Sequence, residues 1–455
     1  MPARPGVDMK AGGDVLAVHE GLCRLPPEAT GSPDQSQQRT SSTILCHSWN
    51  ADRTMVAISP SSREVLIYAV PSLAEEAVGK LKLVATLREH DQAVSFLDWC
   101  PKRDLLLSCS HDRNCYVWSR DAAAAAGGAG AWSPSLVVLR LNRAVTCGSW
   151  APSEKKFAVG SGAKSVSVCY YEPENNWYVS KLIKKKHSST VTGVSWHPGG
   201  ALLATSSTDG KVRIFTAVVR GVDDAAAGKA PLFSCLGPKE HFGECVYELG
   251  AGGAWVHGVS WSPSGTAVAA VAHSSMLLHV SGLDVGQNYG GEGGDAASTA
   301  AGLRRALRVE RVSHRGLPHK CVMFLSDDRL LAAGYDNVPV VYAARRDAAG
   351  GGARWEQQGV MTGAKQEQAT NKNFGAALAR FKNQDDLGVD STASLSSSQP
   401  SSHPHSNTIT CVRPVASAAD GEVLCFSSSS DDGRLVLWKT KADSSAADLM
   451  GRLRI

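Results

Sequence analysis

Short runs of β-branched, aliphatic and aromatic residues alternate with turn-forming residues along most of the chain. The runs are bounded by Gly, Asp, Ser or Pro, which is the pattern of strands. Apolar residues within them do not recur at helical spacing. The sequence therefore predicts an all-β protein from about residue 44 onward.

Tryptophan residues mark a repeat of these runs. Five of them each end a run of alternating apolar and polar residues: Trp49, Trp99, Trp150, Trp196 and Trp261. The last four are followed two residues later by proline. Their separations are near the roughly 40–45 residues of a WD-repeat propeller blade once loop insertions are allowed.

Each unit contains further strand-like runs. A second apolar run follows each Trp, and a third β-rich run closes each unit. The closing runs end at Tyr68, Trp118, Tyr171, Phe215, Val280, Tyr342 and Trp438. A four-stranded sheet cannot bury both faces alone, so such units pack around an axis. The pattern predicts a seven-bladed WD40 β-propeller.

An aspartate recurs at one fixed distance before the closing aromatic residue. The pairs are Asp112 with Trp118, Asp209 with Phe215, Asp336 with Tyr342, and Asp432 with Trp438. His90 and His187 also share one distance before their aromatic residues. In WD repeats such an aspartate accepts a hydrogen bond from a buried histidine, which a Ser or Thr hydroxyl and the aromatic residue hold in turn.

The hydroxyl of this network has two candidates in each of two units: Ser108 or Ser110, and Thr205 or Ser206. A hydrolase triad would use the same residue types. Because the sets repeat at blade spacing, we interpret them as structural braces, with no catalytic role.

Composition agrees with a globular protein. Hydrophobic residues make up 43% and charged residues 20%, which excludes a fully disordered chain and a coiled coil. The net charge of +4 is too small for a protein whose whole surface binds nucleic acid. No apolar stretch approaches the ~18–20 residues that cross a bilayer, and the N-terminus has no signal-peptide core, so we expect a cytosolic protein without membrane insertion.

Signals for cofactors and metals are weak. The 12 cysteines contain no CxxC pair, so neither zinc nor a disulfide framework is expected. The segment VGSGAKS lacks the glycine that a phosphate loop has before Lys164. His403 and His405 lie in a polar segment without a carboxylate or thiol at ligand spacing. We expect no cofactor, no metal and no enzymatic activity.

The domain organisation follows from these patterns. A Pro-, Gly-, Ser- and Gln-rich segment precedes the repeats and is expected to be a flexible extension, although Val15–His19 could instead supply an outer strand that latches the ring. The predicted parts are an extension over 1–43, blades 1 to 6 over 44–354, an insertion arm over 355–408, and blade 7 with a C-terminal segment over 409–455.

The insertion arm contains a short amphipathic pattern. Phe374, Leu378 and Phe381 fall at i, i+4 and i+7, on one face of a helix, with Arg380 and Lys382 beside them. A helix on a stalk can lay its apolar face into a partner's groove. Folding back on the propeller is the alternative, and spacing does not decide between them.

One strong basic cluster interrupts the repeats, at Lys184, Lys185 and Lys186. It predicts either a solvated blade edge or a contact for an acidic partner surface, which electrostatic attraction would steer.

Several stretches go beyond the general WD-repeat consensus. They are HSWNADRTMVAISPSSREVLIY, LREHDQAVSFLDWCPKRDLLLSCSHDRNCYVW, the segment from LVVLRLNRAV through YYEPENNW to SWHP, WVHGVSWSPSG and LLAAGYDNVPVVY. Together they resemble the family of subunit 1 of the actin-related protein 2/3 complex, from about residue 44 to the C-terminus. The long N-terminus, the Ala/Gly-rich loops and the link between the fourth and fifth units depart from that family.

The resemblance implies a non-catalytic scaffold subunit in the cytoplasm and cytoskeleton. Its implied partners are the other subunits, the actin filament and a nucleation-promoting factor that activates branching. It also implies that the arm faces the mother filament, through Phe374, Leu378, Arg380, Phe381 and Lys382. The alternative function is that of a WD-repeat adaptor presenting peptides to a ubiquitin ligase or signalling complex.

Overall fold

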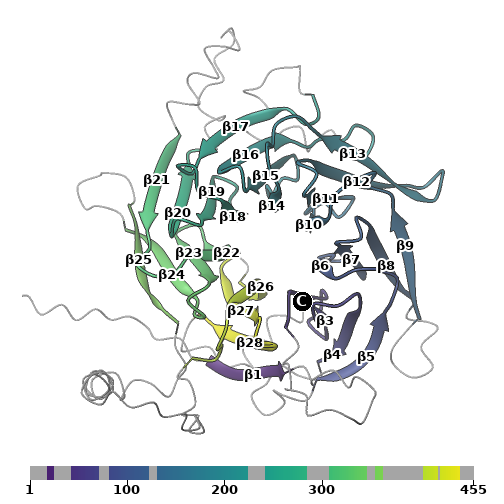
Figure 1. Ribbon diagram of the computed structural model, residues 1–455, viewed down its shortest axis with the longest axis horizontal. Coiled ribbons are helices and arrows are strands. Elements are labelled where there is room, and N and C mark those ends of the chain that lie inside the picture. The colour runs from purple at the N-terminus through teal and green to yellow at the C-terminus, as the bar shows by residue number, and fades with distance from the viewer. Residues whose placement is uncertain are drawn as a thin grey trace, which may run out of the picture.

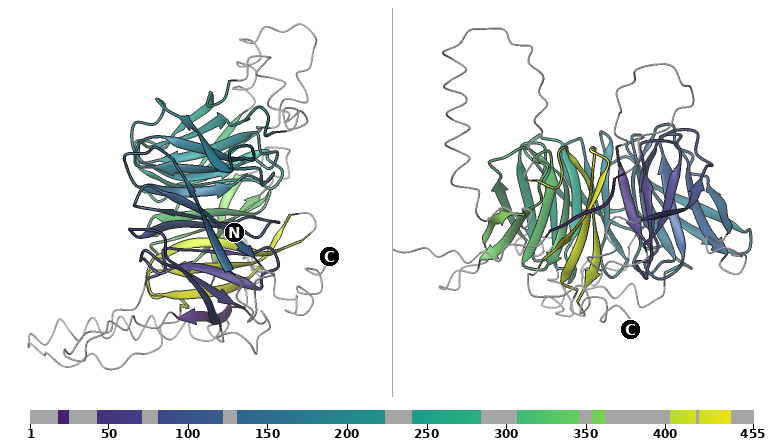
Figure 2. Two further views of the ribbon diagram at one scale, coloured as in Figure 1. Left: turned by 90° about the vertical axis from the view of Figure 1, so that its right-hand side faces the viewer. Right: turned by 90° about the horizontal axis from the view of Figure 1, so that it is seen from below.

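The computed structural model describes residues 18–24, 43–70, 81–121, 131–223, 241–283, 307–345, 354–361, 403–418 and 421–440. These residues form seven four-stranded antiparallel sheets that stand around a central axis like blades (Figures 1 and 2). The predicted all-β, seven-bladed propeller is confirmed. No helix long and apolar enough to span a membrane occurs among these residues.

The first three blades follow one another along the chain. Blade 1 holds β2 (Cys46–Trp49), β3 (Met55–Ser59), β4 (Val65–Ala69) and β5 (Lys82–Leu87). Blade 2 holds β6 (Val94–Trp99), β7 (Leu105–Ser110), β8 (Cys115–Asp121) and β9 (Ala131–Val137). Blade 3 holds β10 (Val145–Trp150), β11 (Lys156–Ser161), β12 (Val166–Glu172) and β13 (Trp177–Ile183).

The next three blades continue the order. Blade 4 holds β14 (Val191–Trp196), β15 (Leu202–Ser207), β16 (Lys211–Thr216) and β17 (Cys245–Gly250). Blade 5 holds β18 (Val256–Trp261), β19 (Ala267–Ala272), β20 (Met276–Ser281) and β21 (Arg308–Ser313). Blade 6 holds β22 (His319–Ser326), β23 (Arg329–Gly334), β24 (Val340–Arg345) and β25 (Arg354–Val360).

Blade 7 joins the two ends of the chain. It holds β26 (Ile409–Ser417), β27 (Val423–Ser430) and β28 (Arg434–Lys439), and its outer strand is β1 (Val18–Arg24). β1 pairs antiparallel with β28, with Val18 opposite Trp438. Of the latch predicted at Val15–His19, Val18 and His19 lie in this strand, which continues to Arg24.

The tryptophans of the repeat end the inner strands and are almost fully buried. The second strands are buried except at the first residue of β7 and of β23, and β19 shows this with six small apolar residues in succession. Neighbouring blades cover both faces of each such strand, so polar residues are not needed on either face.

Side chains of the inner strands connect blades 1 to 5 in succession and blade 7 to blade 1. Near the start of four inner strands a hydroxyl donates to the carbonyl that begins the next blade: Ser95 to Val145 at 2.8 Å, Thr146 to Val191 at 2.5 Å, Thr192 to Val256 at 2.5 Å and Thr410 to Ile44 at 2.6 Å. At the other end, the amide of Trp99 donates to Ser48 Oγ at 2.8 Å, and that of Trp150 to Asp98 Oδ2 at 2.7 Å. These bonds are buried or partly buried and fix the spacing of the blades that they join.

The insertion arm differs from its predicted limits at both ends. β25, the outer strand of blade 6, occupies Arg354–Val360, and Trp355 is buried against Phe324. At the other end, residues 403–408 lie against blade 7, where His405 is fully buried. The arm residues Phe374, Leu378, Arg380, Phe381 and Lys382 lie outside the described residues.

Candidate functional site

The aspartates of the repeat lie in the turns between the second and third strands. Because the strands are antiparallel, these turns lie on the same face of the ring as the loops that enter each blade. That face holds the braces predicted from the sequence and the basic cluster.

Blade 2 contains a complete brace. His90 Nδ1 lies 2.8 Å from Asp112 Oδ2, and its Nε2 lies 2.8 Å from Ser108 Oγ. Trp118 Nε1 donates to the same hydroxyl at 2.9 Å. Ser108 therefore supplies the hydroxyl, while Ser110 donates to the backbone of the entry loop.

The carboxylate of Asp112 also binds backbone. The amides of Asp91 and Asn114 donate to its two oxygens at 3.0 and 2.8 Å. Burial lowers the pKa of His90, although the hydrogen bond to Asp112 opposes this. One carboxylate thus ties the entry loop to the turn while the ring stays neutral.

Blade 7 repeats this arrangement with His405, which the repeat spacing did not predict. His405 Nε2 lies 2.7 Å from Ser428 Oγ, and Trp438 Nε1 donates to that hydroxyl at 2.7 Å. His405 Nδ1 lies 3.5 Å from Asp432 Oδ1. Burial alone would raise the pKa of Asp432, but the contact with His405 and the Ser406 amide lower it to about 2.

Strand length explains why His405 was missed. Its inner strand β26 has nine residues and three register shifts, whereas β6 of blade 2 has six residues. The histidine therefore does not fall at the distance set by His90. The hydroxyl was the usable signal, because Ser428 precedes Trp438 by the same distance as Ser108 precedes Trp118.

Blade 6 divides the brace between two histidines. His314 Nε2 lies 2.7 Å from Asp336 Oδ2, and His319 Nε2 lies 2.8 Å from the hydroxyl of Tyr342. The two imidazole rings lie against each other with centroids 4.3 Å apart and planes tilted by 36°. His314 stands at the same distance before Tyr342 as His90 before Trp118, so the repeat already contained this signal.

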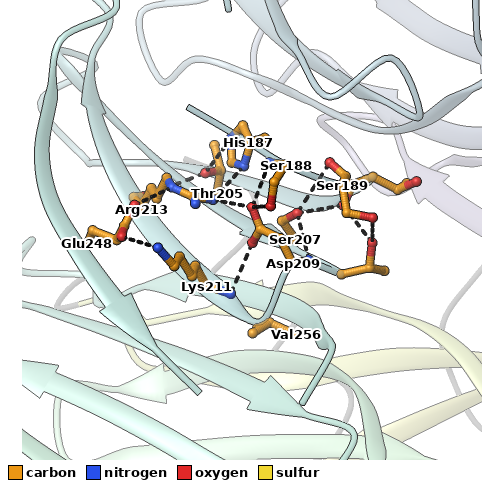
Figure 3. A network of polar contacts seen from close by, with 12 residues as sticks. His187, Ser188, Ser189, Thr205, Ser207, Asp209, Lys211, Arg213, Glu248 and Val256 are labelled. Carbon is orange, nitrogen blue, oxygen red and sulfur yellow. Dashed lines mark hydrogen bonds and ion pairs between the residues drawn. The ribbon is translucent and has the colours of Figure 1, made fainter. Parts of the chain in front are cut away.

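Blade 4 inserts an arginine into the brace (Figure 3). Arg213 Nη1 lies 2.8 Å from Asp209 Oδ2 and 2.9 Å from His187 Nδ1, and its Nε donates to Glu248 at 2.7 Å. His187 Nε2 lies 3.3 Å from Thr205 Oγ1, so Thr205 is the hydroxyl of this blade. Burial, aided by the charge of Arg213, lowers the pKa of His187 to about 4, and the ring accepts from the guanidinium as a neutral base.

The braces offer no open site to substrates. In blades 2 and 7 the histidine, aspartate and hydroxyl are buried and bonded to one another, while Asp209, His314 and Asp336 of the other braces are partly buried and carry hydrogen bonds. The central channel, about 500 Å³ in volume, is lined by the inner strands and by none of the brace aspartates. Within the described ranges, no group of three or more His, Cys, Asp or Glu side chains could hold a metal ion.

The basic cluster follows β13 on the same face. Lys184, Lys185 and Lys186 are all exposed. Lys184 and Lys185 border a separate hollow, together with Arg140 and Lys164. The cluster is therefore part of a larger positive surface, which sequence spacing did not reveal.

Comparison with known proteins shows to which families the chain is similar. The family model for the WD domain, G-beta repeat matches residues 81–119, 179–216 and 397–439, which contain the braces of blades 2, 4 and 7. Subunit 1B of the actin-related protein 2/3 complex from Arabidopsis thaliana is 40% identical over 403 residues, covering 88% of this chain and 95% of the relative. Subunit 1A-B from Xenopus laevis is 36% identical over 409 residues, covering 88% and 94%.

The chain belongs to the family of actin-related protein 2/3 complex subunit 1. Subunit 1 from Saccharomyces cerevisiae is 31% identical over 409 residues, covering 87% of this chain and 94% of the relative. The similarity to this subunit 1 family thus extends across plants, a vertebrate and a yeast, and nearly the whole relative is matched in each case.

Proposed function

We propose that this chain is a non-catalytic scaffold subunit of the actin-related protein 2/3 complex and supports the nucleation of branched actin filaments. The observation that carries this proposal is the 40% identity over 88% of the chain to a protein named as subunit 1 of that complex. Fold alone would support only a scaffold, because propellers serve many functions.

The physical basis of the role is rigidity. Hydrogen bonds of inner-strand side chains join blades 1 to 5 in succession, and the bond from Thr410 Oγ1 to the carbonyl of Ile44 joins blade 7 to blade 1. A ring without open sheet edges at its closure does not splay when neighbours pull on its loops. Such a body holds surfaces at fixed angles, which a filament-nucleating assembly requires of its frame.

The absence of enzymatic activity is part of the proposal. The brace side chains are bonded within the protein, as in His90, whose two ring nitrogens lie within hydrogen-bond distance of Asp112 and Ser108. Burial holds the pKa of His187 at about 4, far below the neutral pH at which a general base is useful.

The proposed partners are the other subunits, the actin filament and a nucleation-promoting factor, in the cytoplasm and cytoskeleton. We assign filament or actin-related-subunit contact to the arm, through Phe374, Leu378, Arg380, Phe381 and Lys382. The exposed cluster of Lys184, Lys185 and Lys186 is suited to an acidic partner surface.

Copurification tests the proposal. A tagged full-length chain expressed in its own cells should bring down two actin-related proteins and the remaining subunits in equal amounts. Recovery of ubiquitin-ligase components without actin relatives would instead support the adaptor alternative and overturn the scaffold assignment.

A further inference from the structure

Blade 3 lacks the brace that its neighbours have. The turn of blade 3 matches that of blade 2. The amide of Gly162 donates to the carbonyl of Ala144, as the amide of His111 donates to the carbonyl of Ala93. By this register Ala163 occupies the position of the brace aspartate Asp112. Leu141 precedes Ala144 by the same number of residues as His90 precedes Ala93, so Leu141 stands at the position of the brace histidine.

The loss of the aspartate leaves two backbone donors free. In blade 2 the Asp112 carboxylate accepts from the amides of Asp91 and Asn114, and in blade 4 Asp209 accepts from two amides at the same positions. The matching amides of blade 3 belong to Asn142 and Ser165. Neither has an acceptor among the residues that the structure describes. Two donors therefore point to a place where other blades hold a negative charge.

A hollow of about 460 Å³ lies at this position. Its polar lining includes Arg140, Asn142, Lys164, Ser165, Lys184 and Lys185, and no carboxylate lines it. His187 also borders it but is neutral, since Nδ1 accepts from Arg213. The volume is in the range of a small-molecule site.

The four cations of the hollow are unpaired. They come from three segments: Arg140 from the entry loop, Lys164 from the turn, and Lys184 with Lys185 from the loop after β13. Within the described part of the chain, none of these four side chains has a hydrogen-bond or ion-pair partner. Like charges gathered without counter-charges repel one another, and an anion would relieve this repulsion.

We propose that this hollow, the anion pocket of blade 3, binds a compact anion with several phosphate groups, of the inositol polyphosphate class. One phosphate accepts from the amides of Asn142 and Ser165, as the brace carboxylate does elsewhere, and the remaining charge meets Arg140, Lys164, Lys184 and Lys185. A compact polyanion matches the site better than an extended acidic peptide, because the cations surround one hollow. The proposal does not depend on membership in the actin-nucleating complex.

The decisive variant restores the missing carboxylate. Ala163→Asp places a side chain that accepts from the same two amides, so it fills the pocket without removing a cation. The matched control is Ser274→Asp, at the same turn position of blade 5, where the native residue is exposed. A second variant, Lys164→Ala with Lys185→Ala, removes charge directly, with Lys102→Ala on the opposite face as its control.

Binding is measured by calorimetry on the purified full-length chain at physiological salt, with inositol hexakisphosphate as the probe. We expect saturable binding at one site, at least about tenfold weaker in Ala163→Asp and in the double lysine variant, and within about twofold of native in both controls. Vesicles containing phosphatidylinositol 4,5-bisphosphate identify the source: binding lost in Ala163→Asp assigns a lipid headgroup, and binding to the free anion alone assigns a soluble one.

Three results would overturn the proposal. The first is no saturable binding of the free anion or the vesicles to the native chain. The second is equal weakening by Ala163→Asp and Ser274→Asp, which would indicate loose charge attraction. The third is tighter binding of a polyglutamate peptide than of inositol hexakisphosphate, lost in Ala163→Asp, which would assign the pocket to an acidic protein segment. Copurification with actin-related proteins is unaffected by any of them, so the two proposals fail separately.

Discussion

Arg213 Nη1 lies 2.9 Å from His187 Nδ1. The arginine thereby separates this histidine from Asp209, whereas the histidines of the other braces contact their aspartates directly. The guanidinium is almost fully buried, and its charge is balanced by Asp209 inside and by Glu248 at the rim. The fourth blade therefore depends on a buried ion pair, whereas blade 2 depends on a direct hydrogen bond between its histidine and its aspartate.

Asp209→Ala should destabilise the protein by about 3 kcal/mol, because it leaves a buried guanidinium with only a half-exposed partner. The measurement is the urea midpoint of unfolding. Lys211→Ala is the control, since its ion pair with Glu248 is exposed on both sides and should change stability by less than about 0.5 kcal/mol. Equal midpoints for Asp209→Ala and the native chain would contradict a structural role for this network.

His279 should make stability depend on pH. Neither of its ring nitrogens has a hydrogen-bond partner in the described ranges, and the ring packs against Trp355 with centroids 4.7 Å apart. Burial lowers its pKa to about 4. The unfolded state therefore takes up a proton near pH 6.5 while the folded state does not, and stability falls as pH drops from 6.5 to 4.

His279→Phe removes this loss. Relative to the native chain, the variant should gain about 2 kcal/mol of unfolding free energy between pH 7.5 and pH 4.5. Other buried histidines titrate equally in both proteins and cancel in the difference. At pH 7.5 the difference in unfolding free energy between variant and native chain reports the packing change alone. If this difference does not vary with pH, His279 is ruled out as a source of acid sensitivity.

The N-terminal strand should contribute to the stability of the ring. Deleting residues 1–24 removes β1 and exposes the edge of β28, so we expect a lower melting temperature and concentration-dependent aggregation. Deleting residues 1–17 keeps the whole strand and serves as the control. If both truncated chains melt together, closure by β1 adds nothing to the fold.

The arm should act in branching and not in stability. Phe374→Ala with Phe381→Ala is expected to leave the melting temperature nearly unchanged and to lower the number of branches per filament length in a microscopy assay of the assembled complex. Leu83→Ala with Leu136→Ala removes exposed apolar side chains from the outer strands and is the control. A native branching rate in the arm variant would remove the filament-contact assignment.

Local pattern was sufficient for most of the fold. The tryptophans end inner strands, and the seven closing runs are the third strands of seven blades, because burial on both faces makes these segments apolar. β1 was harder to predict, since its partner β28 lies at the other end of the chain and local spacing carries no trace of that pairing.

The brace residues show where sequence reasoning stops. Spacing identified His90 and Asp112, which a short regular strand separates. It missed His405, because bulges in β26 change the count, and it gave no sign that Arg213 would enter the network, because side-chain direction in β16 is set by packing. The sequence pointed to the segment of Lys164 and to the lysines after β13 separately, and it gave no sign that they meet Arg140 around one hollow, because three separate loops form it.

The pairing of β1 with β28 has a consequence for synthesis. At about 5–20 residues per second, roughly 20 to 80 s pass between the emergence of Arg24 and that of Trp438 from the ribosome. Throughout that interval β1 has no partner strand. The face of blade 1 that later packs against blade 7 is also exposed. A molecular chaperone that shields these surfaces until translation ends would therefore decide how much of this protein reaches its folded state.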